Sequence, residues 1–108
     1  MLLAVAQHVP MQNLAVHFHD TYGQALANVI TCIESGIRTV DASVSGTGGC
    51  PYAKGASGNL ATEDLVFALN GMDFATGINL DKPADTGAWL SHLLGHVSQS
   101  KTNRALRL

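Results

Sequence analysis

Two stretches of alternating apolar and polar residues, each followed by residues at helical spacing, constrain the fold of this chain more than any other feature. Residues 14–19 put their apolar side chains on one face and their histidines on the other, and residues 39–44 repeat the alternation. A period of two residues is typical of β-strands. We therefore expect strands at 14–19 and 39–44.

Helical patterns follow both predicted strands. Asp20 and Thr21 can cap a helix whose apolar residues recur every three or four positions until Gly36 ends it. The second helix begins near Glu63 and Asp64, because the helix dipole favours acidic residues in a first turn. Strands and helices that alternate in this way predict an α/β fold with parallel strands joined by crossover helices.

A third strand and helix are expected to complete the pattern. The pattern of residues 76–80 predicts a short strand, and Pro83 suits the first turn of the helix that follows. One face of this helix is expected to be buried, and it carries Trp89, Leu90, Leu93, Leu94 and Val97. Residues 98–108 are polar and mixed, so we expect a loose tail there.

Composition narrows the classes of partner. The chain is 46% hydrophobic and only 13% charged, with a net charge of -2 and six scattered Lys and Arg residues. This composition predicts a packed core but no basic surface for nucleic acid. No apolar run approaches the ~18 residues that would span a bilayer, so no membrane partner is expected.

His17 and His19 are the first candidate site residues. Two residues apart on a strand, they project to the same side, as two ligands of one metal must. They also come at a strand end that a helix follows directly, where sites cluster in parallel α/β folds. Two hydrogen-bonded histidines without a metal are the alternative interpretation. His92 and His96 lie four residues apart in the third helix, and we expect them to be solvated surface residues.

A glycine-rich segment is the second candidate. Residues 46–59 contain five glycines, with Cys50 among them. Such a segment lets the backbone approach a ligand and can open and close over a site, although a flexible linker would have a similar composition. It lacks the Gly-Lys-Ser/Thr ending of a nucleotide-binding P-loop.

Four motifs together resemble the hydroxymethylglutaryl-CoA lyases: HFHDTYGQ at 17–24, DASVSG at 41–46, GGCPYA at 48–53 and GASGNLATED at 55–64. The resemblance extends from about Leu14 to Leu80. Related synthases share the His-x-His strand but not the Gly-Gly-Cys-Pro-Tyr segment. Thr47 stands where the family has leucine, which is a mild departure.

The resemblance implies a TIM (β/α)8 barrel, of which residues 1–108 would be the last three βα units of a single domain. It also implies that His17, His19 and the amide oxygen of Asn59 bind a divalent cation, Mg2+ or Mn2+. Zn2+ bound with the help of Cys50 is the less favoured choice. The family's remaining protein ligand, an aspartate next to a catalytic arginine on the first barrel strand, is not found in these 108 residues.

The implied reaction is cleavage of 3-hydroxy-3-methylglutaryl-CoA to acetyl-CoA and acetoacetate, a step of leucine degradation and ketone body formation. His17 and Cys50 are the implied proton-transfer residues, with their division of labour open. Asp41 and Glu63 would orient ligands or loop residues. The flexible loop would turn at its glycines, Gly46, Gly48 and Gly49.

Two other functions stay open at this point. One is an acyl-transferring synthase of the same superfamily, similar to isopropylmalate and homocitrate synthases. The other is a non-catalytic fragment, and we expect the isolated chain to be inactive and prone to self-association. For a full-length lyase we expect a homodimer, located in the cytoplasm of a bacterium or in the mitochondrial matrix of a eukaryote.

Overall fold

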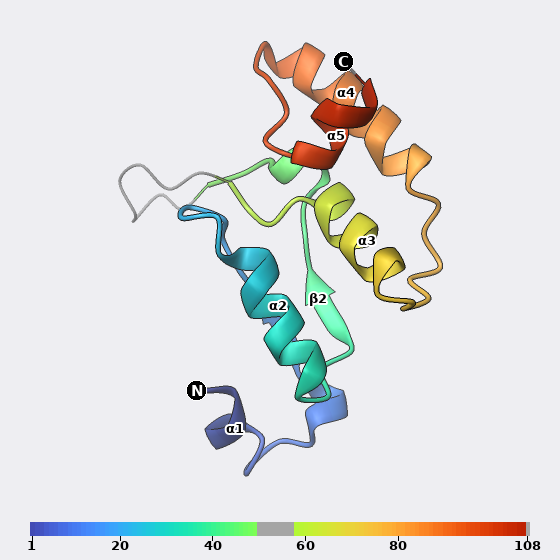
Figure 1. The fold of residues 1–108 in the computed structure, drawn as a ribbon. Helices are drawn as coiled ribbons and strands as arrows, with labels where there is room; N and C mark the ends of the chain where they lie inside the picture. The colour runs from blue at the N-terminus through green and yellow to red at the C-terminus, as the bar shows by residue number, and fades with distance from the viewer. Residues whose placement is uncertain (50–57, 108) are drawn as a thin grey trace.

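The computed structural model describes residues 1–49 and 58–107 of the chain (Figure 1). Two strands and a series of helices succeed one another along it. In chain order the elements are α1 (Leu2–Val5), η1 (Met11–Asn13), β1 (Ala15–His17), α2 (Ala25–Glu34), β2 (Thr39–Asp41), η2 (Val44–Gly46), α3 (Thr62–Gly71), α4 (Asp81–Leu94) and α5 (Lys101–Arg107).

The two strands form a parallel sheet, which confirms the predicted α/β class. Val16 lies opposite Val40, and His17 lies opposite Asp41. Both strands are shorter than predicted, but their extended paths continue into isolated pairings. His19 pairs with Asn59, and Ser43 with Ala61. The segment at 59–61 therefore joins the ends of both strands.

The apolar face of the sheet packs on helices, as the alternation predicts. Buried residues of α2 and α3 form the core with Leu60, with Phe18 directly after β1 and with Val40 of β2. In Figure 1, α2 lies in front of β1, with α3 on the other side of β2. Asp20 Oδ1 accepts a hydrogen bond from the Ala25 amide at 3.0 Å, which stabilises the first turn of α2. His17 lies on the opposite face of the sheet, away from this core.

The prediction of a third strand at residues 76–80 is wrong. The segment at 74–79 has no regular secondary structure, and Gly77 has a φ of 70° that interrupts an extended path. Local hydrogen bonds replace strand pairing: the Ile78 amide donates to the Thr76 hydroxyl at 3.2 Å, and the Asp81 amide donates to Asn79 Oδ1 at 2.9 Å. Short polar side chains of this kind compete with a β-ladder for the backbone.

The prediction of which face of α4 is buried is also wrong. Trp89, Leu93 and Val97 are 62%, 64% and 68% exposed. The buried positions of α4 belong instead to small residues, namely Pro83, Ala84, Gly87 and Ser91. The reason is close approach, because a side chain on Gly87 would collide with the carboxylate of Glu63 and with Asn103.

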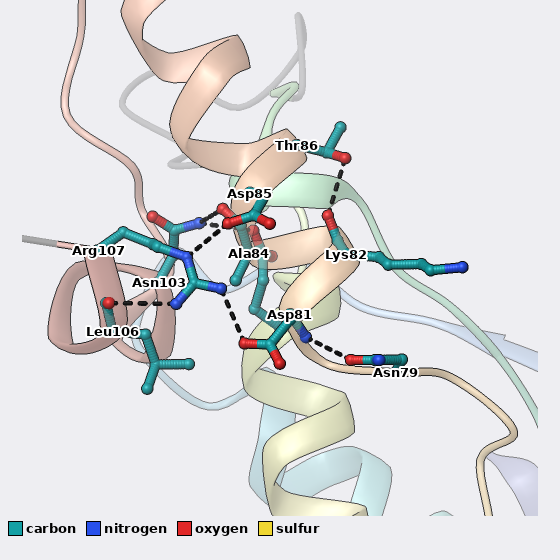
Figure 2. A network of polar contacts seen from close by, with 10 residues as sticks. Asn79, Asp81, Lys82, Ala84, Asp85, Thr86, Asn103, Leu106 and Arg107 are labelled. Atoms are coloured by element: carbon teal, nitrogen blue, oxygen red, sulfur yellow. Dashed lines mark hydrogen bonds and ion pairs between the residues drawn. The ribbon is translucent and has the colours of Figure 1, made fainter.

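Residues 98–107 are not a loose tail, as had been expected, because they form part of the fold. Ser98, Ser100 and Asn103 are buried, and Lys101–Arg107 forms α5. Figure 2 shows how α5 is tied to the start of α4: Arg107 donates to Asp81 at 2.8 Å and to Asp85 at 2.7 Å. Asn103 Nδ2 also donates to the Ala84 carbonyl at 2.7 Å. Within the described part of the chain, no helix has the length and apolar character needed to span a bilayer.

Candidate metal centre

The side chains of His17 and His19 lie together on the face of the sheet that the core leaves open. Their ring centroids are 5.3 Å apart, with the ring planes at 62°. This arrangement follows from the strand alternation, since Phe18 between them points into the core. The side chain of His17 is 54% exposed, so a ligand can reach it.

Asn59 is held beside these histidines by backbone pairing. It forms an antiparallel bridge with His19, and its neighbour Leu60 donates from its amide to the Phe18 carbonyl at 3.2 Å. Asn59 Nδ2 donates to the Thr47 carbonyl at 3.1 Å. Because the carboxamide nitrogen only donates, Oδ1 is the atom of Asn59 that can bind a cation.

Asp41 lies directly across the sheet from His17. The distance from its Oδ2 to His17 Nδ1 is 3.8 Å, which is too long for a hydrogen bond but close enough for attraction to an imidazolium. Both side chains are more than half exposed, which weakens that attraction through solvent. Asp41 therefore borders the histidine pair without being bonded to it.

Glu63 lies in a different environment. It is fully buried, and the Ser45 amide donates to its Oε1 at 3.0 Å and to its Oε2 at 2.9 Å. Asn103 Nδ2 adds a third bond at 3.3 Å. Burial raises the pKa of the Glu63 carboxyl above its ordinary value, and these hydrogen bonds oppose that rise. Glu63 thus supports the turn after β2 rather than the histidines.

The glycines of the predicted flexible loop begin at that turn. Ser45 and Gly46 have φ values of 59° and 66°, and Gly48 has a φ of 108°. These left-handed conformations favour glycine and are strained for Ser45, which Glu63 holds in place. Gly49 is exposed. Cys50, the candidate proton-transfer residue and alternative zinc ligand, lies outside the described residues.

A group of buried polar residues near this turn was missed by sequence reasoning. Ser45 Oγ lies 2.8 Å from Ser91 Oγ and donates to Ser98 Oγ at 2.6 Å. Gln99 contacts the same turn through its backbone and the 58–60 segment through its side chain. Ser98 and Gln99 lie in a stretch whose polar composition is typical of a surface. No spacing of residues in the sequence distinguishes them as buried or functional.

The donor atoms fit a divalent cation only as part of a larger set. Two imidazoles and an amide oxygen suit Mg2+, Mn2+ or Zn2+, but a cation needs four to six ligands. Among the residues that the structure describes, no group of three His, Cys, Asp or Glu side chains could hold a metal ion. His92 and His96 are exposed, as expected.

Known proteins resemble this chain over nearly its whole length. The HMGL-like family model matches residues 1–89. The mitochondrial hydroxymethylglutaryl-CoA lyase of Gallus gallus is 55% identical over 105 residues, which cover 97% of this chain and 35% of that protein. The cytoplasmic 3-hydroxy-3-methylglutaryl-CoA lyase of Rattus norvegicus is 52% identical, over 97% of this chain and 31% of its own length.

Solved structures show the same likeness. The HMG-CoA lyase of Bacillus subtilis matches with a TM-score of 0.93 and 41% identity, over 99% of this chain and 36% of that one. An HMG-CoA lyase from Acinetobacter baumannii, solved in complex with coenzyme A and 3-methylmalate, has a TM-score of 0.90 and 40% identity, over 96% and 34%. The chain thus spans about a third of the length of the proteins it matches.

Proposed function

Because this chain belongs to the HMGL-like family, we propose that residues 1–108 are the C-terminal portion of one TIM-barrel domain of a hydroxymethylglutaryl-CoA lyase. The complete protein would cleave 3-hydroxy-3-methylglutaryl-CoA to acetyl-CoA and acetoacetate. The observation that carries this proposal is the approach of His17, His19 and Asn59 at one end of the parallel sheet. The described sheet supplies two barrel strands, and the remaining strands would come from the rest of the protein.

We propose that His17, His19 and Asn59 are protein ligands of a Mg2+ or Mn2+ ion. The oxygen donor of Asn59 favours these cations, whereas Zn2+ with a Cys50 thiolate is the second choice. When bound, the cation supplies a Lewis acid that polarises the tertiary hydroxyl and a carboxylate oxygen of the substrate. The family's aspartate ligand and its neighbouring arginine would come from the part of the barrel that precedes this chain.

The residues of this chain then account for proton transfer. As the hydroxyl proton leaves, the C2–C3 bond breaks, and the products are the ketone of acetoacetate and the enolate of acetyl-CoA, which then takes up a proton. His17 and Cys50 are our candidates for these two proton transfers, with their division of labour open. Asp41 would orient His17 from across the sheet.

The turn after β2 has a supporting role in this proposal. Glu63 would hold Ser45, and with it the start of the loop that includes Gly46, Gly48 and Gly49. The coenzyme A bound in the Acinetobacter relative supports an acyl-CoA as the partner of the complete protein. We propose a homodimer for that protein. Relatives named as mitochondrial and as cytoplasmic both exist, so either compartment is consistent with the proposal.

The ligand assignment can be tested on the full-length protein by electron paramagnetic resonance of bound Mn2+. We expect His17→Ala, His19→Ala and Asn59→Ala each to weaken Mn2+ binding by tenfold or more, roughly the effect of losing a ligand or its support. His92→Ala and His96→Ala are matched controls, because both residues are exposed. His92 lies near the end of α4, and His96 follows that helix. These two variants should bind Mn2+ like the wild type.

Activity tests the reaction itself. The full-length wild type should release acetoacetate from the branched thioester, and chelation should abolish the release until Mg2+ or Mn2+ is restored. Condensation of acetyl-CoA with a 2-oxo acid, without thioester cleavage, would show instead that the protein is a synthase. Equal Mn2+ affinity in the site variants and the His92 and His96 controls would exclude the proposed ligands.

A further inference from the structure

Gln99, in the connection between α4 and α5, contacts both segments that flank residues 50–57. Its backbone amide donates to the Ser45 carbonyl at 3.1 Å, and its side-chain Oε1 accepts from the Gly58 amide at 2.9 Å. Ser45 follows β2, whereas Gly58 precedes the residue that pairs with His19. One residue therefore links the turn after β2 to the pairing at the end of β1.

The space around this link is closely filled. A Cβ atom built on Gly46 would lie 3.2 Å from Gln99 Cβ and 3.1 Å from the Asn59 carbonyl oxygen. Gly58 is buried, and a Cβ atom there would overlap the Gly46 carbonyl oxygen. Gln99 thus closes one side of a tight backbone crossing at which 46–48 and 58–59 approach each other.

Gln99 is itself held in place by its two neighbours in sequence, which form hydrogen bonds to η2 and α3. Its neighbours in sequence, Ser98 and Ser100, are buried, and Ser98 accepts a hydrogen bond from Ser45. Ser100 Oγ donates to Asp64 Oδ1 at 2.8 Å. Both flanking residues are therefore fixed, which holds the backbone of Gln99, itself an exposed residue, at the position from which Oε1 reaches Gly58.

We infer that Gln99 is a positioning residue, which holds Gly58 so that the Asn59 side chain is presented beside His19. This inference rests on the proposed function, because it concerns Asn59 as a ligand of the divalent cation. Without the Gln99 acceptor, the Gly58 amide loses its partner. The 58–60 segment keeps its pairing with the end of β1, the bond from the Ser43 amide to the Leu60 carbonyl at 2.9 Å and the bond from Asn59 Nδ2 to the Thr47 carbonyl, but the N-terminal side of Asn59 loses its support. The position of Asn59 then becomes less well defined before a cation binds.

The test uses the full-length protein with two substitutions that separate shape from hydrogen bonding. Gln99→Met keeps the length of the side chain but removes the acceptor, while the backbone bond to Ser45 remains in either variant. Gln99→Glu retains an oxygen that can accept from Gly58. Gln12→Met is the matched control, since Gln12 is exposed on η1, before the start of β1, whereas His19 and Asn59 pair beyond the other end of that strand.

We expect Gln99→Met to weaken Mn2+ binding roughly tenfold, which corresponds to about 1.4 kcal/mol. Hydrogen exchange of the 58–60 amides in the metal-free protein should also become faster, with an unchanged melting temperature. Gln99→Glu and Gln12→Met should resemble the wild type in both measurements. This pattern would separate positioning from a general loss of stability, which would speed exchange across all of the core.

The inference is overturned if Gln99→Met binds Mn2+ as tightly as the wild type, or if Gln99→Glu is as defective as Gln99→Met. It is also overturned if exchange at 58–60 is unchanged. A wild-type protein that binds no Mn2+ would overturn the proposed function instead. In that case the exchange measurement would still show whether Gln99 holds Gly58.

Discussion

The carboxylate of Glu63 occupies a fully buried position on α3, where charge is costly unless it is compensated. The Ser45 amide and Asn103 compensate it in part, and together they tie the turn after β2 to α5. Desolvation nevertheless outweighs these bonds, so the pKa of Glu63 in the folded protein is raised above the ordinary 4.5. The protonated form is therefore favoured by folding.

This shift predicts a pH dependence of stability. A raised native pKa means that the free energy of unfolding falls as pH rises from 4.5 through the native pKa of Glu63. Each pH unit between the native and unfolded pKa values corresponds to about 1.4 kcal/mol. Glu63→Gln removes this contribution, so the stability of the wild type relative to Glu63→Gln should decline with rising pH in urea titrations. A pH-independent difference would contradict the prediction.

Gly58 gives a second prediction at the scale of one residue. Because a Cβ atom there would overlap the Gly46 carbonyl oxygen, Gly58→Ala must displace the backbone beside Asn59. We expect a loss of about 1–3 kcal/mol in stability, as for other overpacked sites, together with weakened Mn2+ binding. Thermal unfolding and Mn2+ titration of the full-length protein measure both effects.

Gly71 offers the control for this substitution. It ends α3, and nothing lies within 4 Å of a Cβ atom built there. Gly71→Ala should therefore be neutral or stabilising by about 0.5–1 kcal/mol. Equal stability of the two alanine variants would show that the crossing at Gly58 has room for a side chain.

At the scale of elements, α5 depends on α3 for its formation. A helix of seven residues is unstable by itself, because few hydrogen bonds offset the cost of its first turn. Asp64 on α3 accepts from the amides of Lys101 at 3.2 Å and Thr102 at 2.8 Å. Ser100 Oγ accepts from the Asn103 amide at 2.9 Å. Free amides at the start of α5 are thus satisfied, as helix capping requires.

Removal of this cap should affect α5 before the rest of the fold. We expect Asp64→Ala to lower the free energy of unfolding by about 1–2 kcal/mol and to accelerate hydrogen exchange within α5. Glu34→Ala is a matched control, because Glu34 is an exposed carboxylate at the end of α2. The role assigned to Asp64 is wrong if α5 exchanges no faster in Asp64→Ala than in Glu34→Ala.

At the scale of the molecule, the described residues form an open structure rather than a closed barrel. They measure 44 × 35 × 18 Å, and their sheet has two strands, each with one edge that no further strand pairs. An apolar hollow of about 370 Å³ lies beside β2, and another of about 200 Å³ lies beside β1. Val40 and Leu65 are among the lining residues of the first, and Leu2 and Val16 of the second.

These open edges and hollows predict the behaviour of the isolated 108 residues. Exposed strand edges and apolar hollows favour association, so light scattering should show oligomers or aggregates. We expect no cleavage of the branched thioester, because the isolated chain spans only about a third of the length of its relatives and would lack the further ligands of the proposed cation. Addition of the N-terminal two thirds of the Bacillus subtilis relative should reduce the association. A stable, active monomer would contradict both expectations.

Several features of the fold and site could be predicted from the sequence because they depend on local periodicity. The alternation around His17 and His19 places both imidazoles on one face of any strand that buries Phe18. The helices α2 and α3 follow from apolar spacing with a stop at a glycine, as at Gly71. Periods of two and of three to four residues need no knowledge of distant parts of the chain.

Other features were decided only by tertiary structure. Thr76–Leu80 alternates like a strand but finds local hydrogen-bond partners, and α4 buries Gly87 rather than Trp89 because it must approach Glu63 closely. Ser98, Ser100 and Asn103 are buried because partners far away in sequence satisfy them. Burial depends on which surfaces meet, and the 46-residue separation of Ser45 from Ser91 leaves no trace in local spacing.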